Sequence, residues 1–368
     1  MKQVFRWIIF LFSLFIIIGI LICCFYERDK PPVTEIKKAR DLITLARSAG
    51  ADKFASTIYI NAVSAYDSAM HCWNIENEKL AFFRNHDKTR EWALEANGLA
   101  ENATKQSKDN SARIKSKLSV HFQETEKNMK RYQNKFSNIP QPESVRQIFR
   151  KGEIQFNEAH LAYEKGDFNL ASSKLNDATQ NINKAHNFLL NHVHNYFQAY
   201  ENWKAWVDES IALSKKQKKS CIVIDKFGHE CFLYQNGQLK ATFEADLGKN
   251  WIGNKMFQDD HTTPEGKYKI IEKKQNGKTR YHKALLINYP NQEDIIRFEK
   301  NKKNGTISAR KKIGGLIEIH GQGGQGADWT QGCVALSDND MDRLFALVEK
   351  GTPVIIVGST RTVEEILK

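Results

Sequence analysis

Glycine and proline are distributed very unevenly along this chain of 368 residues. Sixteen of the 21 glycines lie from Gly228 onward, and the seven prolines leave residues 33–139 and 143–215 free of proline. These two residue types disfavour the interior of a helix most strongly. The chain therefore divides into a helical region, residues 31–215, and a C-terminal region of different architecture, residues 216–368.

Apolar side chains within residues 31–215 recur at three- and four-residue spacing, as on one face of a helix. These stripes are Ile36, Ala39, Ile43 and Ala46; Trp92, Ala96, Leu99, Ala100 and Ala103; and Phe168, Ala171, Leu175, Ala178, Ile182 and Ala185. The clearest break is 137–144, and residues 162–168 are similar to the turn of a tetratricopeptide-like hairpin. We expect an all-α domain, either a bundle or a hairpin repeat, that serves as a spacer or docks a partner protein.

The N-terminal segment is strongly apolar. The stretch from Trp7 to Phe25 contains 19 residues, and at about 1.5 Å per helical residue it spans roughly 28 Å, enough for a bilayer core. Lys2 and Arg6 precede it, which places the N-terminus in the cytoplasm by the positive-inside rule. We expect residues 1–30 to contain a cytoplasmic N-terminus and a single-pass anchor in the inner (cytoplasmic) membrane, with the rest of the chain in the periplasm or cell envelope.

Two other roles of this segment fit its sequence less well than an uncleaved anchor. A cleaved signal peptide is disfavoured because the apolar run is long and no small-x-small cleavage site follows it. A lipoprotein anchor is disfavoured because Ile22 precedes Cys23 where a small residue is expected. A shortened mature protein would contradict the predicted anchor.

From Cys221 onward apolar residues recur at every second position, which is typical of strands. We expect strands at 221–225, 230–235, 239–246, 267–273, 284–288, 315–320 and 353–357. The dipeptide Asn236-Gly237 predicts a tight hairpin turn. Ser337-Asp338 is a reasonable cap for one helix near 338–350. Residues 216–368 are thus predicted to form a mostly-β catalytic domain with a packed helix.

Two residues of this domain carry reactive groups. His320 ends the apolar run 316–320, and Cys333 follows Gly332 in a turn, with 12 residues between the histidine and the cysteine. The intervening loop is rich in glycine and can fold tightly enough to bring the two side chains together. A thiolate can attack a carbonyl carbon while an imidazole takes and returns the proton, and nearby backbone N–H groups can hold the oxyanion. The pair predicts nucleophilic acyl transfer without a metal or a cofactor.

Other interpretations of these residues are weaker. A lone cysteine is often a small buried apolar residue. A structural zinc site needs about four nitrogen or sulfur ligands, whereas one cysteine and one histidine converge here. Residues 321–326 match G-x-G-x-x-G, but a dinucleotide site needs a helix that opens at the third glycine. No helical apolar period follows until Met341.

Residues 219–358 resemble the L,D-transpeptidase (YkuD-type) catalytic domain. The family motif is His-Gly, a short loop and then Ser/Thr-x-Gly-Cys, and His320-Gly321 and Thr330-Gln331-Gly332-Cys333 fill these places. Three segments upstream are similar to further landmarks of the family in the same order: 245–250, 263–268 and 288–291.

The resemblance implies a peptidoglycan enzyme whose acyl donor is a stem peptide with diaminopimelate at its third position. It implies that Cys333 is the nucleophile, that His320 is the base and then the acid, and that the Gly321 carbonyl orients the imidazole. The oxyanion donors are expected to be the N–H groups of Gly332 and Cys333. The residues expected to contact the substrate are Tyr289, Trp329, Thr330 and Gln331.

Two departures from the family pattern leave the reaction open. Gln331 stands where well-known members have histidine, and Ala335 stands where they have arginine or asparagine. The run Asp328-Trp329-Thr330 resembles a subgroup that includes an amidase able to detach protein from peptidoglycan. Three functions therefore remain: a transpeptidase, a hydrolase that releases cross-linked protein or peptide, and an inactive wall-binding scaffold. The arginine missing at position 335 removes an expected contact to a substrate carboxylate.

The net charge limits the kinds of partner that we expect, and the number of cysteines limits the disulfide bonds that could form. The formal net charge is +12, and outside the membrane we expect it to meet wall carboxylates or anionic lipid headgroups rather than nucleic acid. Four cysteines beyond the apolar segment are too few for a disulfide scaffold. Cys221 and Cys231 flank a predicted hairpin, and the sequence leaves a bond between them open because it does not give their Cα separation.

Overall fold

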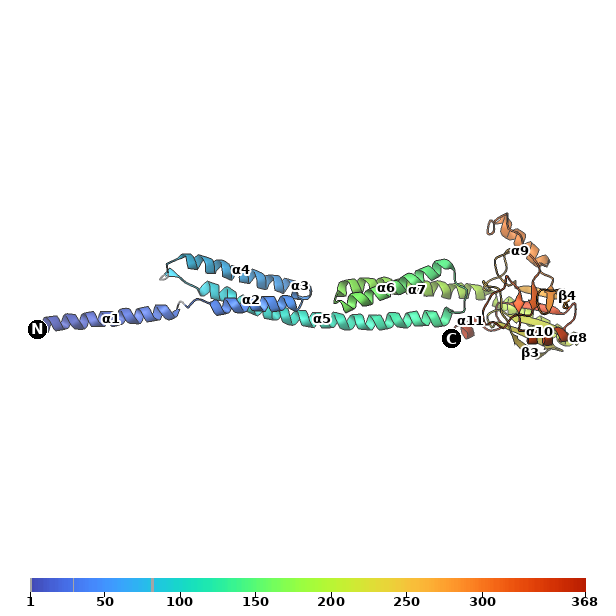
Figure 1. Ribbon diagram of the computed structural model, residues 1–368, viewed down its shortest axis with the longest axis horizontal. Coiled ribbons are helices and arrows are strands. Elements are labelled where there is room, and N and C mark those ends of the chain that lie inside the picture. The colour runs from blue at the N-terminus through green and yellow to red at the C-terminus, as the bar shows by residue number, and fades with distance from the viewer. Residues whose placement is uncertain (1, 29, 81–82) are drawn as a thin grey trace. The chain divides into compact units, whose positions relative to one another are not determined.

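The computed structural model describes residues 2–28, 30–80 and 83–368 (Figure 1). The chain forms two compact units. One contains Met1–Gln123 and Ala162–Ser172, and the other contains Glu124–Leu161 and Ser173–Lys368. Helices make up the chain up to Gln217, and strands begin at Ser220. The predicted order, a helical region followed by a mostly-strand domain, is confirmed.

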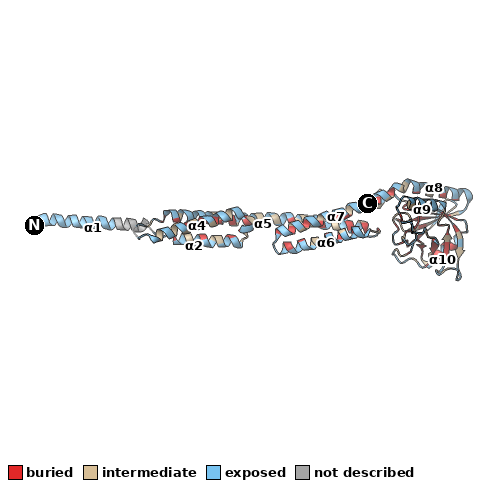
Figure 2. Ribbon diagram, turned by 90° about the horizontal axis from the view of Figure 1, so that it is seen from above, coloured by how far each residue is buried: buried red, intermediate tan, exposed pale blue. Residues whose placement is uncertain are grey.

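Helix α1 (Lys2–Arg28) contains the apolar N-terminal stretch. Among the described residues it is the one helix that is long and apolar enough to cross a membrane, and its window Gln3–Ile20 is not covered by protein (Figure 2). A signal sequence would meet the same criteria. The membrane anchor therefore stays a prediction.

The first unit is built from helices with small side chains at their contacts. Helices α2 (Val33–Ser48), α3 (Ala51–Phe54) and α4 (Ser56–Glu78) lie together with the first part of α5 (Asp87–Phe136). Their buried faces consist largely of alanine: Ala39, Ala46, Ala51, Ala55, Ala62, Ala65, Ala69, Ala96, Ala100 and Ala103. Alanine at the contact allows helix axes to approach closely and favours the helix itself.

The helices from the end of α5 onward begin and end at the predicted breaks; their segment Ala162–Ser172 belongs to the first unit, and Glu124–Leu161 and the residues from Ser173 onward belong to the second. Helix α5 ends at Phe136 and α6 (Glu143–Glu164) begins after the proline-containing break. Helix α7 (Phe168–Tyr196) begins after a turn in which Gly166 adopts a φ of 74°. The apolar stripe that begins at Phe168 is buried along its whole length. A short 3₁₀ turn, η2 (Phe197–Ala199), leads into α8 (Tyr200–Gln217).

The C-terminal part of this unit is an 8-stranded sheet in the order β3-β2-β1-β8-β4-β5-β6-β7. The pairs β1–β8 and β6–β7 are parallel, and the other neighbours are antiparallel. The strands are β1 (Ser220–Asp225), β2 (Glu230–Gln235), β3 (Gln238–Glu244), β4 (Gly266–Lys274), β5 (Ala284–Ile287), β6 (Glu318–His320), β7 (Val334–Ala335) and β8 (Pro353–Val357). Asn236 and Gly237 both have positive φ in the β2–β3 turn, as a two-residue hairpin requires.

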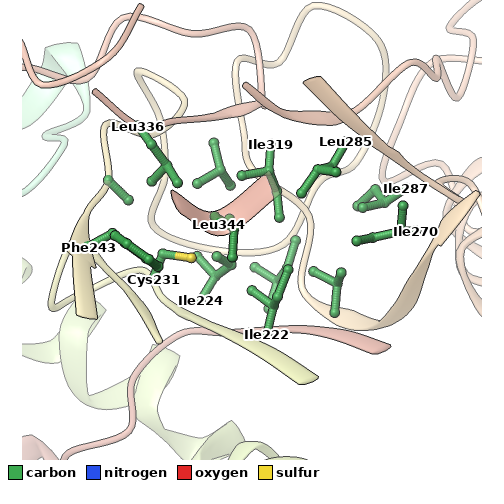
Figure 3. Close-up of a cluster of buried hydrophobic side chains, with 14 of the residues drawn as sticks. Ile222, Ile224, Cys231, Phe243, Ile270, Leu285, Ile287, Ile319, Leu336 and Leu344 are labelled. Atoms are coloured by element: carbon green, nitrogen blue, oxygen red, sulfur yellow. The ribbon is translucent and has the colours of Figure 1, made fainter. Parts of the chain in front are cut away.

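Both faces of the central strands are covered, which explains their unbroken apolar sequences. One face forms an inner core with helix α10 (Asp338–Leu347), shown in Figure 3. This inner core includes Ile222, Ile224, Phe243, Ile270, Leu285, Ile287, Ile319, Val334, Leu336 and Leu344. On the other face, Val223, Ile355 and Val357 pack in a cluster that also holds Phe197 and Trp203.

Helices α7 and α8 are joined to the sheet by two specific contacts. Trp203 of α8 is fully buried above Gly358, where a Cβ would lie 2.2 Å from the indole ring. The ammonium of Lys226 is fully buried and bonds to Glu265 at 2.7 Å, and the same Glu265 oxygen accepts from the Tyr196 hydroxyl at 2.5 Å. A buried ion pair needs such additional partners to offset its desolvation.

The structure adds three elements that the strand and helix pattern did not predict. Helix α9 (Gln292–Lys303) starts with a capping box between Asn291 and Asp294. The others are the two-residue strand β7 and helix α11 (Val363–Ile366). Cys221 and Cys231 do not form a disulfide bond, because the register of β1 and β2 places Cys231 opposite Ile224 and Cys221 opposite Tyr234. Both cysteines are free and buried.

Candidate active site

The sheet register places His320 and Cys333 on one side of adjacent strands. Ile319 pairs with Val334, and both belong to the inner core. Because side chains alternate along a strand, Glu318 and His320 point away from that core. Cys333 precedes Val334 and lies beside Glu318, so its side chain points to the same side. The Cys333 Sγ accepts a hydrogen bond from the Glu318 N–H at 3.4 Å.

His320 has one ring nitrogen fixed and one free. Its Nδ1 lies 2.6 Å from the Gly321 carbonyl oxygen, so Nδ1 carries the proton and donates it there. Its Nε2 is buried and has no hydrogen-bond partner in the described part of the chain. Burial lowers the pKa of His320, against the opposite effect of the Gly321 bond. The resting imidazole is therefore neutral, with Nε2 ready to accept a proton.

Two aromatic rings enclose this imidazole. Tyr281 stacks on it with ring centroids 3.5 Å apart and an interplanar angle of 7°. Trp329 meets it edge-on, with centroids 5.8 Å apart. Apolar rings on two sides account for the complete burial of His320 and for the preference for its neutral form.

The Cys333 thiol is half-buried and neutral at rest. Its S–H points toward the Leu316 carbonyl oxygen, 3.8 Å away. Burial raises the pKa of Cys333 to about 11, although the Glu318 N–H and the charges of Arg280 and Lys255 lower it. A thiol with such a pKa is not a thiolate at neutral pH, so its reaction needs a base at the moment of attack.

The turn before Cys333 requires glycine. Gly332 has a φ of 127°, and a Cβ there would lie 2.7 Å from the Thr262 carbonyl oxygen. Its N–H donates to Thr330 Oγ1 at 3.1 Å, and the Thr330 hydroxyl donates to the Cys333 carbonyl at 2.7 Å. Thr330 thus fixes the turn, and an oxyanion would share the Gly332 donor with its hydroxyl.

The glycine-rich loop is held from one side by the segment that follows β3. Asp246 forms an isolated bridge with Ala335, and Gly248 forms one with Thr330. The Asp246 carboxylate accepts from the Gln325 N–H at 3.0 Å and from the Trp329 indole N–H at 3.3 Å. This carboxylate therefore positions the ring that contacts His320.

A cavity of about 530 Å³ opens beside the thiol. Its lining residues come from four loops: Lys255, Gln258, Asp259, Arg280, Tyr281, Gly314, Gly315, Leu316, Ile317, Trp329, Thr330, Gln331 and Cys333. A cavity of this size admits a short peptide segment. An entering carbonyl group would meet Cys333 at its wall.

The comparison with protein families identifies the domain that contains this arrangement. Residues 219–356 match the model of the L,D-transpeptidase catalytic domain, YkuD. These residues form an L,D-transpeptidase catalytic domain. The resemblance seen in the His-Gly and Thr-x-Gly-Cys motifs is thereby confirmed for this part of the chain.

Solved L,D-transpeptidases show a low overall likeness to the chain. The enzyme from Mycobacterium smegmatis is 16% identical with a TM-score of 0.25, and the match covers 38% of this chain and 58% of that one. L,D-transpeptidase 1 from Mycobacterium tuberculosis is 17% identical with a TM-score of 0.25, covering 38% and 62%. The catalytic domain from E. faecium is 18% identical with a TM-score of 0.26, covering 38% and 98%. No curated protein matches the chain.

The L,D-transpeptidase domain brings most of the predicted site residues together. Trp329, Thr330, Gln331 and Cys333 line one cavity. Tyr289 does not. It is 5% exposed within the inner core, and its hydroxyl donates to the Ile313 carbonyl at 3.3 Å. Tyr289 is a structural residue in this fold, and we leave it out of the proposed site.

Residues of the L,D-transpeptidase site that sequence reasoning missed lie in loops without periodicity. Arg280 and Tyr281 belong to the β4–β5 loop, about forty residues before His320 in the chain. Leu316 has a φ of 58° and is 74% exposed at the cavity. An exposed leucine with a left-handed backbone is uncommon and marks functional sites, but this signal exists only in three dimensions.

Proposed function

We propose that this protein is a cell-envelope cysteine acyltransferase that acts on peptidoglycan stem peptides through a thioester on Cys333. The observation that carries the proposal is the state of His320. Its Nδ1 donates to the Gly321 carbonyl, and its buried Nε2 has no hydrogen-bond partner among the described residues, on the side of the sheet that carries the thiol. A base with one fixed tautomer beside a neutral thiol suits proton transfer during attack.

The proposed first half-reaction proceeds in two steps. His320 Nε2 takes the thiol proton while Sγ attacks the carbonyl carbon of the donor amide. The resulting oxyanion is held by the Cys333 N–H and by the Gly332 N–H, which Thr330 now shares. The amide C–N bond then breaks, the leaving amine takes the proton from His320, and the acyl group remains on sulfur.

The second half-reaction decides between transfer and hydrolysis. An amine that attacks the thioester gives a cross-link, and water gives a free acid. Hydrolysis is the second candidate, because Trp329 and Thr330 of the amidase-like motif line the cavity whereas Ala335, in place of arginine, is buried and brings no charge to it. The proposed acceptor of the main candidate is an amine.

The proposed arrangement of the chain delivers this site to the wall. Residues 1–30 anchor it in the inner membrane through residues 7–25, residues 31–215 act as a helical spacer or docking module for an envelope protein, and residues 216–368 are catalytic and lie in the periplasm. The apolar exposed helix α1 and the net charge of +12 support this placement.

The test uses the full chain in a non-ionic detergent with muropeptides released from isolated peptidoglycan. Masses of the products distinguish the candidates: a dimer with loss of the leaving amine supports transfer, and a gain of water without a dimer supports hydrolysis. Cys333→Ala is the control and should form neither product. If Cys333→Ala is as active as an active wild type, the reaction does not pass through a Cys333 thioester and the proposal fails. If the wild type changes no substrate, the proposal fails in favour of an inactive scaffold.

A further inference from the structure

The cavity beside Cys333 contains two cations that differ in how their charge is compensated. Lys255 is 4% exposed and pairs with Asp260 at 2.6 Å. Arg280 is exposed, and its guanidinium forms no ion pair with a carboxylate of the described residues, including Asp259 of the same cavity. Arg280 therefore presents to an entering ligand a positive charge that is not held in an ion pair among the described residues.

This guanidinium is oriented by the site. Arg280 Nη2 donates to the Tyr281 hydroxyl at 2.8 Å, and the guanidinium carbon lies 5.0 Å from the Tyr281 ring centroid. Tyr281 is itself stacked on His320. Since a guanidinium has five N–H donors in a planar fork, most of them remain free for a carboxylate.

The charge of Arg280 also reaches both reactive groups. Burial raises the pKa of Cys333 and lowers the pKa of His320, and the Arg280 charge lowers both. Because Arg280 and Cys333 line the same cavity, a carboxylate bound to Arg280 would share that cavity with the carbonyl that Cys333 attacks. Leu316, 74% exposed at the same cavity, provides an apolar surface for the rest of the ligand.

We propose that Arg280 is the carboxylate-binding specificity residue of this site and selects peptides with a free carboxylate close to the reacting carbonyl. Position 335 offers no such contact, because Ala335 is fully buried. The assignment deepens the proposed function by naming the chemical feature of the ligand. Its test below does not depend on turnover, so the two proposals fail separately.

The test compares two small electrophiles that differ only in charge. Iodoacetate carries a carboxylate and iodoacetamide carries the neutral amide, and in each case Cys333 Sγ displaces iodide. Full-length protein in non-ionic detergent is treated with each reagent, and labelling of Cys333 is followed by mass spectrometry of its peptide. The measured quantity is the ratio of the iodoacetate rate to the iodoacetamide rate.

Arg280→Gln should lower this ratio by about five- to tenfold, the effect of losing one charge-assisted contact. Arg280→Lys keeps the positive charge but loses the planar pair of N–H donors, so its ratio should lie between those of the wild type and Arg280→Gln. Lys278→Gln, an exposed residue of the same loop outside the cavity, is the matched control and should leave the ratio within about twofold. Equal ratios in the wild type and Arg280→Gln would overturn the proposal, as would an equal drop in Lys278→Gln.

Discussion

The imidazole of His320 lies flat on the ring of Tyr281, with centroids 3.5 Å apart. The histidine has no charged partner on Nδ1, which bonds to the Gly321 carbonyl. The Gly321 bond and the aromatic rings orient the imidazole, and burial is the largest influence on its pKa, ahead of the opposing charge of Glu318. Tyr281 contributes both by excluding water and by holding the ring.

Removal of this ring should change the pH dependence of the reaction. Burial lowers the pKa of His320, and the neutral form is the base in the proposed mechanism. Tyr281→Ala hydrates the imidazole, so the acid limb of the kcat/KM profile should move to higher pH. Tyr281→Phe retains the stack and should leave that limb in place. A profile of Tyr281→Ala that coincides with the wild type would contradict a shielding role.

The same shift links His320 to stability. A histidine whose pKa is lowered by folding stabilises the native state above its unfolded pKa of about 6.5, and this contribution is lost as pH falls through the folded pKa. Replacement by glutamine, which cannot be protonated, should therefore reduce the loss of stability on acidification. Urea unfolding of the wild type and His320→Gln at pH 7 and pH 5 measures it. An identical loss in both would show that His320 is not the titrating group.

Cys333 should behave as a protected thiol in the free protein. Burial raises its pKa to about 11. Because the thiolate is the reactive form, its alkylation by iodoacetamide should rise about tenfold per pH unit between pH 7 and pH 10 without a plateau. Peptide mass spectrometry gives the rate at this residue. A plateau reached by pH 8 would instead indicate a preformed thiolate–imidazolium pair.

Gly332→Ala should damage the site more than the fold. The substitution combines a left-handed φ of 127° with a Cβ placed 2.7 Å from the Thr262 carbonyl. We expect a loss of about 1–3 kcal/mol of unfolding free energy and a fall in kcat of about 10²–10³, because the turn carries the proposed oxyanion donors. Thermal unfolding and initial rates measure the two effects.

Gly351→Ala is the matched control for this substitution. Gly351 also has a positive φ, 92°, but its Cβ position is open and lies outside the cavity lining. This variant should lose only the part of the stability that comes from the left-handed backbone and should keep its activity. Equal activity losses in both variants would show that backbone strain alone explains the effect at Gly332.

Local chemistry in the sequence predicted much of this molecule. The proline-containing break at 137–144, the Asn236-Gly237 turn and the apolar stripe from Phe168 each express a short-range rule, and each is present in the structure. The order of the eight strands is not a local property, because β1 pairs with β8 through a connection of more than a hundred residues. Helix α9 was missed although Asn291 and Asp294 form its capping box.

The candidate site divides in the same way. His320 and Cys333 could be predicted from the sequence because both lie in one motif, and the glycines between them allow the intervening loop to close. Tyr281 and Arg280 approach only when β5 pairs with β6 and brings its preceding loop over the imidazole. Tyr289 illustrates the opposite error, since an aromatic residue beside proline suits a cleft wall and a core equally well, and burial decides.

The most direct test of the account is the search for a covalent intermediate on Cys333. Full-length protein is mixed with a stem tetrapeptide or a carbapenem, quenched in acid, digested and weighed. The account predicts the mass of the acyl group on the peptide that contains Cys333, a much slower appearance of that adduct in His320→Gln and none in Cys333→Ala. An active protein without an adduct on Cys333, or an adduct that persists in Cys333→Ala, would contradict the central claim.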